Sequence, residues 1–273
     1  MNLAFLFLSL SAVFYGAAFL AHLVSFLGGW QEGRRFAFFF LRLGFFVGTF
    51  YFAAEAVEHS VFLPVAGASQ ATAFLAWAIA FVYLVLLVRI QSESFGLILT
   101  PILFFFVLTA CFTFDGIVKP LSFPVNAYFV IHILSAFFAY ASFTLSFAAG
   151  ILYLIQHHEL KVKHTGRFYH KLPSLEELEK LIYQPILWGL PLLIFAVAIG
   201  LFWAKSVFGV FWIFDPKTVA VIVTALLYFA IVYLHYISAV RGKRVVVFSL
   251  VAFAFVLFSF MGTRLIQGSH NFF

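Results

Sequence analysis

The chain has 273 residues, of which 65% are hydrophobic, 21% aromatic and only 10% charged, and its mean hydropathy is +1.11. Soluble globular chains carry about 25% charged residues, so this composition excludes a water-soluble protein and predicts one solvated by lipid. The apolar runs continue for about 20 residues, which favours membrane helices over a barrel of alternating strands. The only cysteine, Cys111, excludes an intrachain disulfide, a CxxC redox pair and a thiolate metal site.

Eight apolar segments predict an all-α polytopic membrane protein, a bundle of about eight transmembrane helices in one domain over residues 1–273. They are Leu3–Leu27, Phe36–Ala56, Thr72–Ile90, Phe95–Phe114, Pro124–Gln156, Gln184–Ala204, Pro216–Val240 and Val245–Ile266. The first is too long for a signal peptide and lacks a charged segment before it, so we expect a retained helix. The fifth exceeds the thickness of a bilayer and should tilt or project into water.

The basic residues predict the orientation, because Lys and Arg collect in cytoplasmic loops. Twelve fall on one side: Arg34, Arg35, Arg42, Arg89, Lys161, Lys163, Arg167, Lys171, Lys180, Arg241, Lys243 and Arg244. Four fall on the other: Lys119, Lys205, Lys217 and Arg264. We therefore expect a multi-pass protein of the cytoplasmic membrane with both termini on the outer side. The same asymmetry accounts for the net charge of +6, so the expected partner is the lipid bilayer and not nucleic acid.

The largest polar segment, residues 157–183, is predicted to be an inner loop. Ser174 and Glu177 have the spacing of a capping box, and a helical stripe of leucine and isoleucine follows. We expect an amphipathic helix lying on the inner membrane surface. A docking site for a cytosolic partner is the alternative interpretation.

An aromatic connector, residues 203–217, is expected on the outer side between the sixth and seventh spans. His132 lies about two turns into the fifth span from its outer end, and His270 follows the eighth span on the same side. Two imidazoles that bind iron from opposite sides, with rings that cover the porphyrin, predict a heme site. The rings that would form this cover are Trp203, Phe208, Trp212 and Phe214.

Asp215 belongs to the same predicted heme site, as an acidic group near the cofactor. It also precedes Pro216 at the start of the seventh span, and an Asp-Pro pair is typical of an N-cap and first helical position. We expect the capping role whatever the function.

His22 and His235 form a second candidate pair. Each lies about six residues before the inner end of its span, so both are at similar depth in the inner half of the bilayer. Ionisable groups at that depth are costly and often functional, and the pair predicts an inner heme site with both histidines as iron ligands. The alternative is that each is a buried histidine bonded to a neighbouring helix.

These elements together resemble the cytochrome c assembly family, that is, the CcsA-type heme-handling proteins and their HemX-like relatives. The likeness is strongest in IHILSAFFAYASFTLSFAAGILYLIQ, KLPSLEELEKLIYQPILWGLPLL, YLHYISAVRGKR and GTRLIQGSH. Family members carry a WGxxWxWDPKE loop, of which this chain keeps Gly209, Trp212, Asp215, Pro216 and Lys217. Phe208 and Phe214 stand where the family has tryptophans, and Thr218 replaces the glutamate.

By this resemblance, His132 and His270 match the two outer histidines of the family and His235 matches one within the membrane. His22 has no counterpart in the motif, and Gly48 stands where many members have a histidine. The loop departures preserve the aromatic faces but remove two indole N–H donors.

The resemblance implies a carrier that binds heme b transiently and presents it on the outer face for attachment to the thiols of an apocytochrome c. It implies a CcsB/ResB-type membrane protein as partner. No catalytic residues are expected, and the chain would act as a chaperone that shares the ligation step with its partner. Two alternatives stay open: a HemX-type membrane regulator of tetrapyrrole synthesis, and a heme-free polytopic transporter or structural subunit.

Overall fold

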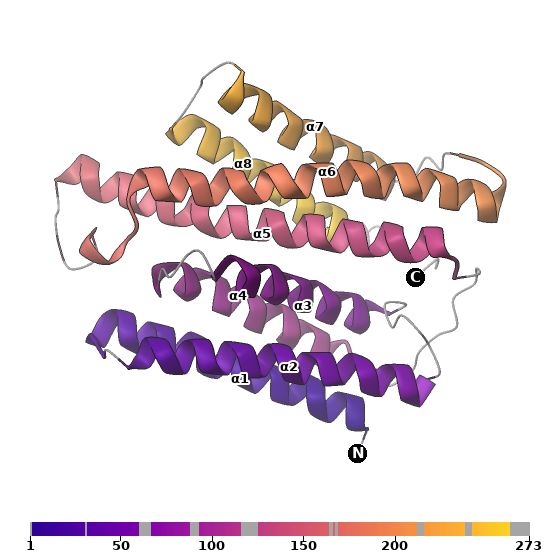
Figure 1. Ribbon diagram of the computed structural model, residues 1–273, viewed down its shortest axis with the longest axis horizontal. Helices are drawn as coiled ribbons and strands as arrows, with labels where there is room; N and C mark the ends of the chain where they lie inside the picture. Colours follow the sequence, from indigo (N-terminus) through magenta and orange to yellow (C-terminus); the bar gives the residue numbers. More distant parts are fainter. Residues whose placement is uncertain are drawn as a thin grey trace. The chain divides into compact units, whose positions relative to one another are not determined.

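The computed structural model describes residues 2–30, 32–59, 67–87, 93–115, 125–163, 166, 169–211, 216–237 and 242–262. These residues form eight long α-helices (Figure 1). The helices are α1 (Leu3–Gly28), α2 (Gly33–His59), α3 (Ala68–Leu87), α4 (Glu93–Phe112), α5 (Ala127–Val162), α6 (Leu175–Phe208), α7 (Pro216–Tyr236) and α8 (Lys243–Leu257). Two single turns follow α5 and α8: η1 (Tyr169–Lys171) and η2 (Phe258–Gly262).

Each of the eight helices is long and apolar enough to cross a membrane, which confirms the predicted all-α class and the multi-pass character. Side-chain caps explain several helix starts. Asn2 accepts a hydrogen bond from Ala4 N at 2.9 Å, and Asn126 accepts one from Phe129 N at 3.0 Å. At the end of α6, Gly209 adopts a positive φ of 75°, a left-handed conformation that glycine adopts without steric cost.

The predicted amphipathic helix is not a separate element in the structure. Its capping box is present, since Ser174 and Glu177 satisfy each other's backbone N–H groups, but the helix that it starts is α6 itself. The helix continues for 34 residues through Pro185 and Pro191. Three residues of its apolar stripe are buried in the protein: Leu178, Leu181 and Ile182.

The predicted inner loop 157–183 is correspondingly shorter. Its first six residues complete α5, which ends at Val162, and residues 175–183 belong to α6. The polar segment between the two helices is therefore confined to residues 163–174.

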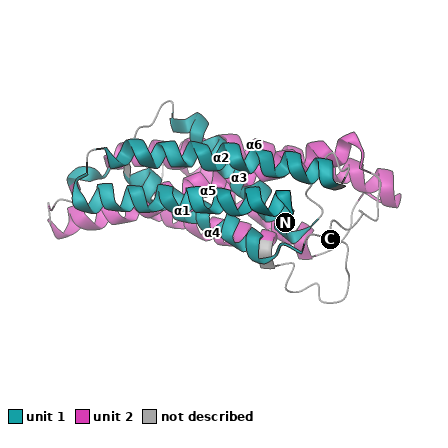
Figure 2. Cartoon of the chain, turned by 90° about the horizontal axis from the view of Figure 1, so that it is seen from below, with its two compact units in different colours: residues 1–121, 170–172, 273 teal, residues 122–169, 173–272 magenta. Residues whose placement is uncertain are grey.

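The chain divides into two compact units, coloured separately in Figure 2. Unit 1 comprises residues 1–121 and 170–172, and unit 2 comprises residues 122–169 and 173–272. The single domain and the membrane orientation stay predictions.

In unit 1, α1 packs against α2 and α4, and α3 packs against α4 and α2. Buried hydroxyls bond across these contacts: Ser11 Oγ donates to Gly44 O at 2.9 Å, and Ser69 Oγ donates to Ala110 O at 2.8 Å. Small residues and serines let helix backbones approach closely in an apolar environment, where packing replaces the hydrophobic effect as the source of stability.

In unit 2, α5 packs against α6 and α8, and α7 packs against α8 and α6. Phe143 and Tyr228 stack at a centroid distance of 3.7 Å, which joins α5 to α7. A Cβ at Gly189 would lie 2.7 Å from the Phe143 ring, so α6 needs glycine here to accommodate that ring. The packing of α5 against α6 positions His132, the first residue of the candidate site.

Candidate functional site

His132 lies between α5 and α6, where its ring contacts the α6 backbone. Its Nδ1 is 2.7 Å from Ala196 O. A carbonyl oxygen can only accept, so Nδ1 carries the proton and Nε2 keeps its lone pair. Histidines that bind metals are held in the same way, by donation from the other ring nitrogen to a backbone carbonyl. The donor chemistry at His132 therefore fits an axial heme ligand.

Gly200 has no side chain and so leaves room for the imidazole of His132 beside the α6 backbone. It lies one turn after Ala196 on α6, and a Cβ built on it would lie 2.8 Å from His132 Nδ1. Any larger residue at position 200 would push the imidazole away from the carbonyl that sets its tautomer.

An aromatic cluster begins about one helical turn from His132 on α5 and about one turn from Gly200 on α6. Phe129 precedes the histidine by three residues on α5 and is 2% exposed. Its ring is 5.4 Å from that of Trp203 on α6, and Trp203 meets Phe208 edge to face at 5.8 Å. Two of the four predicted covering rings, Trp203 and Phe208, thus lie in one cluster at the end of α6.

A polar bridge ties the helix ends that carry this cluster. Asn126, the N-cap of α5, donates from Nδ2 to Ser206 Oγ at 3.2 Å. Ser206 Oγ in turn donates to Trp203 O at 2.7 Å. Beside them Lys205 Nζ lies 4.0 Å above the Phe211 ring centroid, a cation–π contact that leaves the ammonium at the surface.

Four predicted site residues lie outside the described residues: Trp212, Phe214, Asp215 and His270. Their roles as covering rings, acid and second axial ligand stay predictions. The predicted connector 203–217 is shorter in the structure, because α6 ends at Phe208 and α7 starts with Pro216.

Phe129, Ala196 and Gly200 are site residues that the sequence pattern did not reveal. A signal was present for two of them. Phe129 is one turn from His132 on the same helix face, and Gly200 is an isolated glycine in an apolar span, which is typical of a close contact between helices.

His235 lies on α7 within unit 2 and stacks on Tyr183 of α6, with ring centroids 3.4 Å apart and planes 20° apart. Tyr236 packs edge to face on the same imidazole at 4.5 Å. The imidazole is therefore held between aromatic rings at the end of α7.

His22 lies on α1 within unit 1 and is 0% exposed. Among the described residues neither of its ring nitrogens has a hydrogen-bond partner. Phe38 packs against it edge to face at 5.3 Å, and a Cβ at Gly96 would lie 2.4 Å from Nε2. A buried imidazole of this kind has a nitrogen lone pair that can bind a metal ion. Because His22 and His235 belong to different units, their pairing stays a prediction.

A family model described as Cytochrome C assembly protein matches residues 65–270. Protein HemX of Bacillus subtilis (strain 168) is 27% identical over 252 residues, covering 91% of this chain and 90% of that protein. The cytochrome c biogenesis protein CcsA of Guillardia theta is 23% identical over 233 residues, covering 78% of this chain and 77% of that protein.

A solved structure titled Cytochrome c Heme Lyase CcmF has the same fold over 95% of this chain, with a TM-score of 0.69 and 16% sequence identity. This chain spans 46% of that protein's length, so the likeness concerns the fold alone.

Proposed function

Because the chain belongs to the cytochrome c assembly protein family, we propose that it binds heme b transiently and presents it on the outer face of the cytoplasmic membrane for attachment to c-type cytochromes. The observation that supports this most directly is the imidazole of His132. Its Nδ1 bonds to Ala196 O, and its Nε2 lone pair is left for iron. His270 would supply the opposite ligand.

The residues of this chain would act by holding and covering the cofactor. Heme supplies vinyl groups that react with cysteine thiols of an apocytochrome c. His132 would bind the iron through Nε2, and Trp203 and Phe208 would lie against the apolar ring and exclude water from it. Trp212 and Phe214 would extend this cover and Asp215 would cap α7. No nucleophile of this chain takes part, so it would act as a carrier with a CcsB/ResB-type partner.

The second set of histidines would form the inner site of the same carrier. His22 is buried without a hydrogen-bond partner among the described residues, and His235 is stacked on Tyr183. Each imidazole would bind iron at this inner site. If units 1 and 2 bring the two histidines together, they would be the two ligands of one heme.

The visible spectrum of the purified protein tests the proposal. Protein expressed in heme-replete cells should show the paired α and β bands of bis-histidine heme after reduction with dithionite. His132→Ala and His270→Ala should lose most of the absorbance at unchanged yield, whereas the control His158→Ala, exposed near the other end of α5, should keep it. A colourless wild-type preparation would refute heme binding.

A second candidate function is favoured by the similarity to two HemX proteins, at 27% and 25% identity. In that case the chain would be a membrane regulator of tetrapyrrole synthesis that acts through its inner face. The exposed pair Glu176 and Lys180, bonded at 2.8 Å, tests it without disturbing the buried stripe of α6. Charge reversal of both residues should change heme-precursor levels under the regulator hypothesis and leave c-type cytochrome levels unchanged under the carrier hypothesis.

A further inference from the structure

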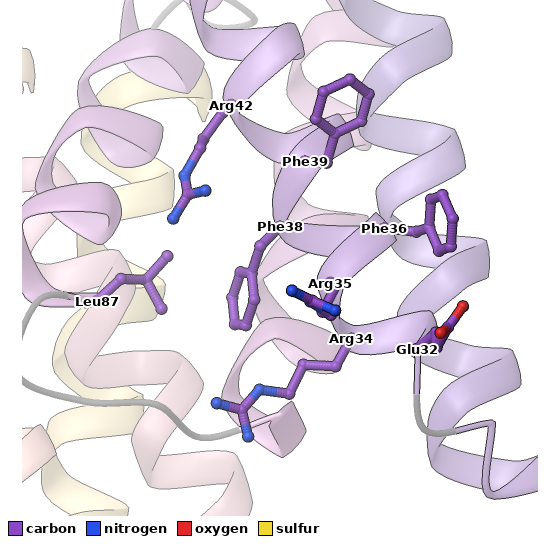
Figure 3. A pocket seen from close by; sticks show the side chains of 8 residues that line it. All are labelled: Glu32, Arg34, Arg35, Phe36, Phe38, Phe39, Arg42 and Leu87. Carbon is purple, nitrogen blue, oxygen red and sulfur yellow. The ribbon is translucent and has the colours of Figure 1, made fainter.

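A basic pocket of about 640 Å³ lies in unit 1, on one side of the first half of α2 (Figure 3). Three arginines line it: Arg34, Arg35 and Arg42. Leu87, at the end of α3, faces them across the opening. Of the described residues that line the pocket only Glu32 is acidic, so their side chains carry an excess of positive charge.

Arg34, Phe38 and Arg42 follow one another at intervals of four residues, which places them on the same face of α2. Figure 3 shows the Phe38 ring between the two arginine side chains. Eight residues of helix separate the Cα atoms of Arg34 and Arg42 by about 12 Å. Arginine side chains are long enough for both guanidinium groups to reach a ligand that lies over Phe38.

Arg42 is the informative member, because it lies more than two turns inside α2, between apolar neighbours in the sequence. An arginine inside a membrane segment is costly and is normally paired or directed to an interface. Among the described residues Arg42 has no ion pair or hydrogen bond, and neither has Arg35. An anionic ligand in this pocket would offset that cost.

Apolar surface continues directly from the charged wall. Phe36 and Phe39 also line the pocket and are 44% and 54% exposed. A ligand that satisfies both surfaces carries an anionic head and an apolar tail. Among the described residues that line the pocket there is no histidine, cysteine or methionine, so they offer a heme no preferred iron ligand, and free phosphate would leave the exposed rings unused.

We propose that this pocket binds an acidic membrane phospholipid. Its phosphate would lie between the guanidinium groups of Arg34 and Arg42, which bind phosphate oxygens in a bidentate manner. Its acyl chains would lie over Phe36 and Phe39. Basic pockets between membrane helices bind acidic lipid headgroups on the same principle.

Native mass spectrometry of the full chain in neutral detergent tests this assignment. After delipidation the protein is titrated with phosphatidylglycerol, with phosphatidylcholine or with inorganic phosphate. We expect one phosphatidylglycerol to bind at least about tenfold more tightly than phosphatidylcholine, and inorganic phosphate not to compete at equal concentration. Arg42→Gln should weaken phosphatidylglycerol binding about tenfold or more, in keeping with the strength of charged hydrogen bonds.

Arg34→Gln provides a second variant with the same expected loss, should Arg42→Gln reduce the yield of folded protein. Arg244→Gln, an exposed arginine at the start of α8 in unit 2, is the charge-matched control and should bind like the wild type. Equal binding of the two lipids would overturn the proposal. So would equal loss in Arg244→Gln, or displacement of the lipid by heme or by inorganic phosphate.

Discussion

His132 on α5 donates its Nδ1 proton to the carbonyl of Ala196 on α6 over 2.7 Å. The bond crosses between two helices and fixes the tautomer, so the chemistry of one side chain depends on the packing of two spans. Gly200 is what keeps that packing close.

Gly200→Val should therefore impair heme binding without removing a ligand. The new side chain would occupy the space of the imidazole, whose Nδ1 lies 2.8 Å from a Cβ at this position. We expect the reduced α-band absorbance to fall about tenfold or more and the free energy of unfolding to fall by about 1–3 kcal/mol. Gly28→Ala, where a Cβ meets nothing within 4 Å, is the control and should match the wild type in both measurements.

Substitutions at Trp203 should distinguish stacking of its aromatic ring from hydrogen bonding by its indole N–H. Trp203→Phe keeps an aromatic face against Phe129 and should retain heme, whereas Trp203→Ala should weaken heme affinity about two- to tenfold, from a loss of about 0.5–1.5 kcal/mol per aromatic pair. Affinity is measured by heme titration in detergent. Trp188→Ala, exposed on the same helix at 46%, is the matched control. An equal loss in Trp203→Phe and Trp203→Ala would contradict a stacking role.

Gly96 and His22 should behave as a coupled pair in unit 1. Gly96→Ala places a methyl group 2.4 Å from His22 Nε2 and should lower the free energy of unfolding by about 1–3 kcal/mol. His22→Ala opens space for that methyl group, so the double variant should lose less than the sum of the two single variants. Thermal unfolding of the four proteins measures the coupling. Strict additivity would show that the ring and position 96 are not in contact.

Glu55 should tolerate amide replacement but not an apolar one. It is 0% exposed on α2, and its Oε2 accepts a hydrogen bond from Gln70 Nε2 at 3.3 Å. Glu55→Gln keeps an acceptor in the same place and should change the free energy of unfolding by less than about 1 kcal/mol. Glu55→Leu removes the acceptor and leaves a buried amide unsatisfied, at a cost of about 1–3 kcal/mol. Chemical denaturation in detergent would show whether the two variants differ in this order.

Hydropathy was sufficient to predict the eight helices, because each must satisfy its backbone within the membrane and so carries a long apolar run. It placed the start of α6 incorrectly. The sixth apolar segment predicts a span that begins at Gln184. The helix instead begins at Leu175, and proline is tolerated inside it, as is common in membrane helices.

The candidate site was predictable only where single residues carry the signal. Histidines and tryptophans are conspicuous in an apolar chain, so His132 and Trp203 could be named. Their partners could not, because which face of α5 meets which face of α6 depends on side-chain packing that no local pattern specifies. The Ala196 carbonyl is the clearest case, since a backbone acceptor leaves no trace in residue type.

Phe38 belongs to two environments at once, since it lines the basic pocket and packs edge to face on His22. A ring cannot shift toward one neighbour without altering its contact with the other. The lipid headgroups present are therefore expected to alter the surroundings of the His22 imidazole. Spectra or redox titrations recorded in a neutral detergent should differ from those recorded in bilayers rich in anionic lipid.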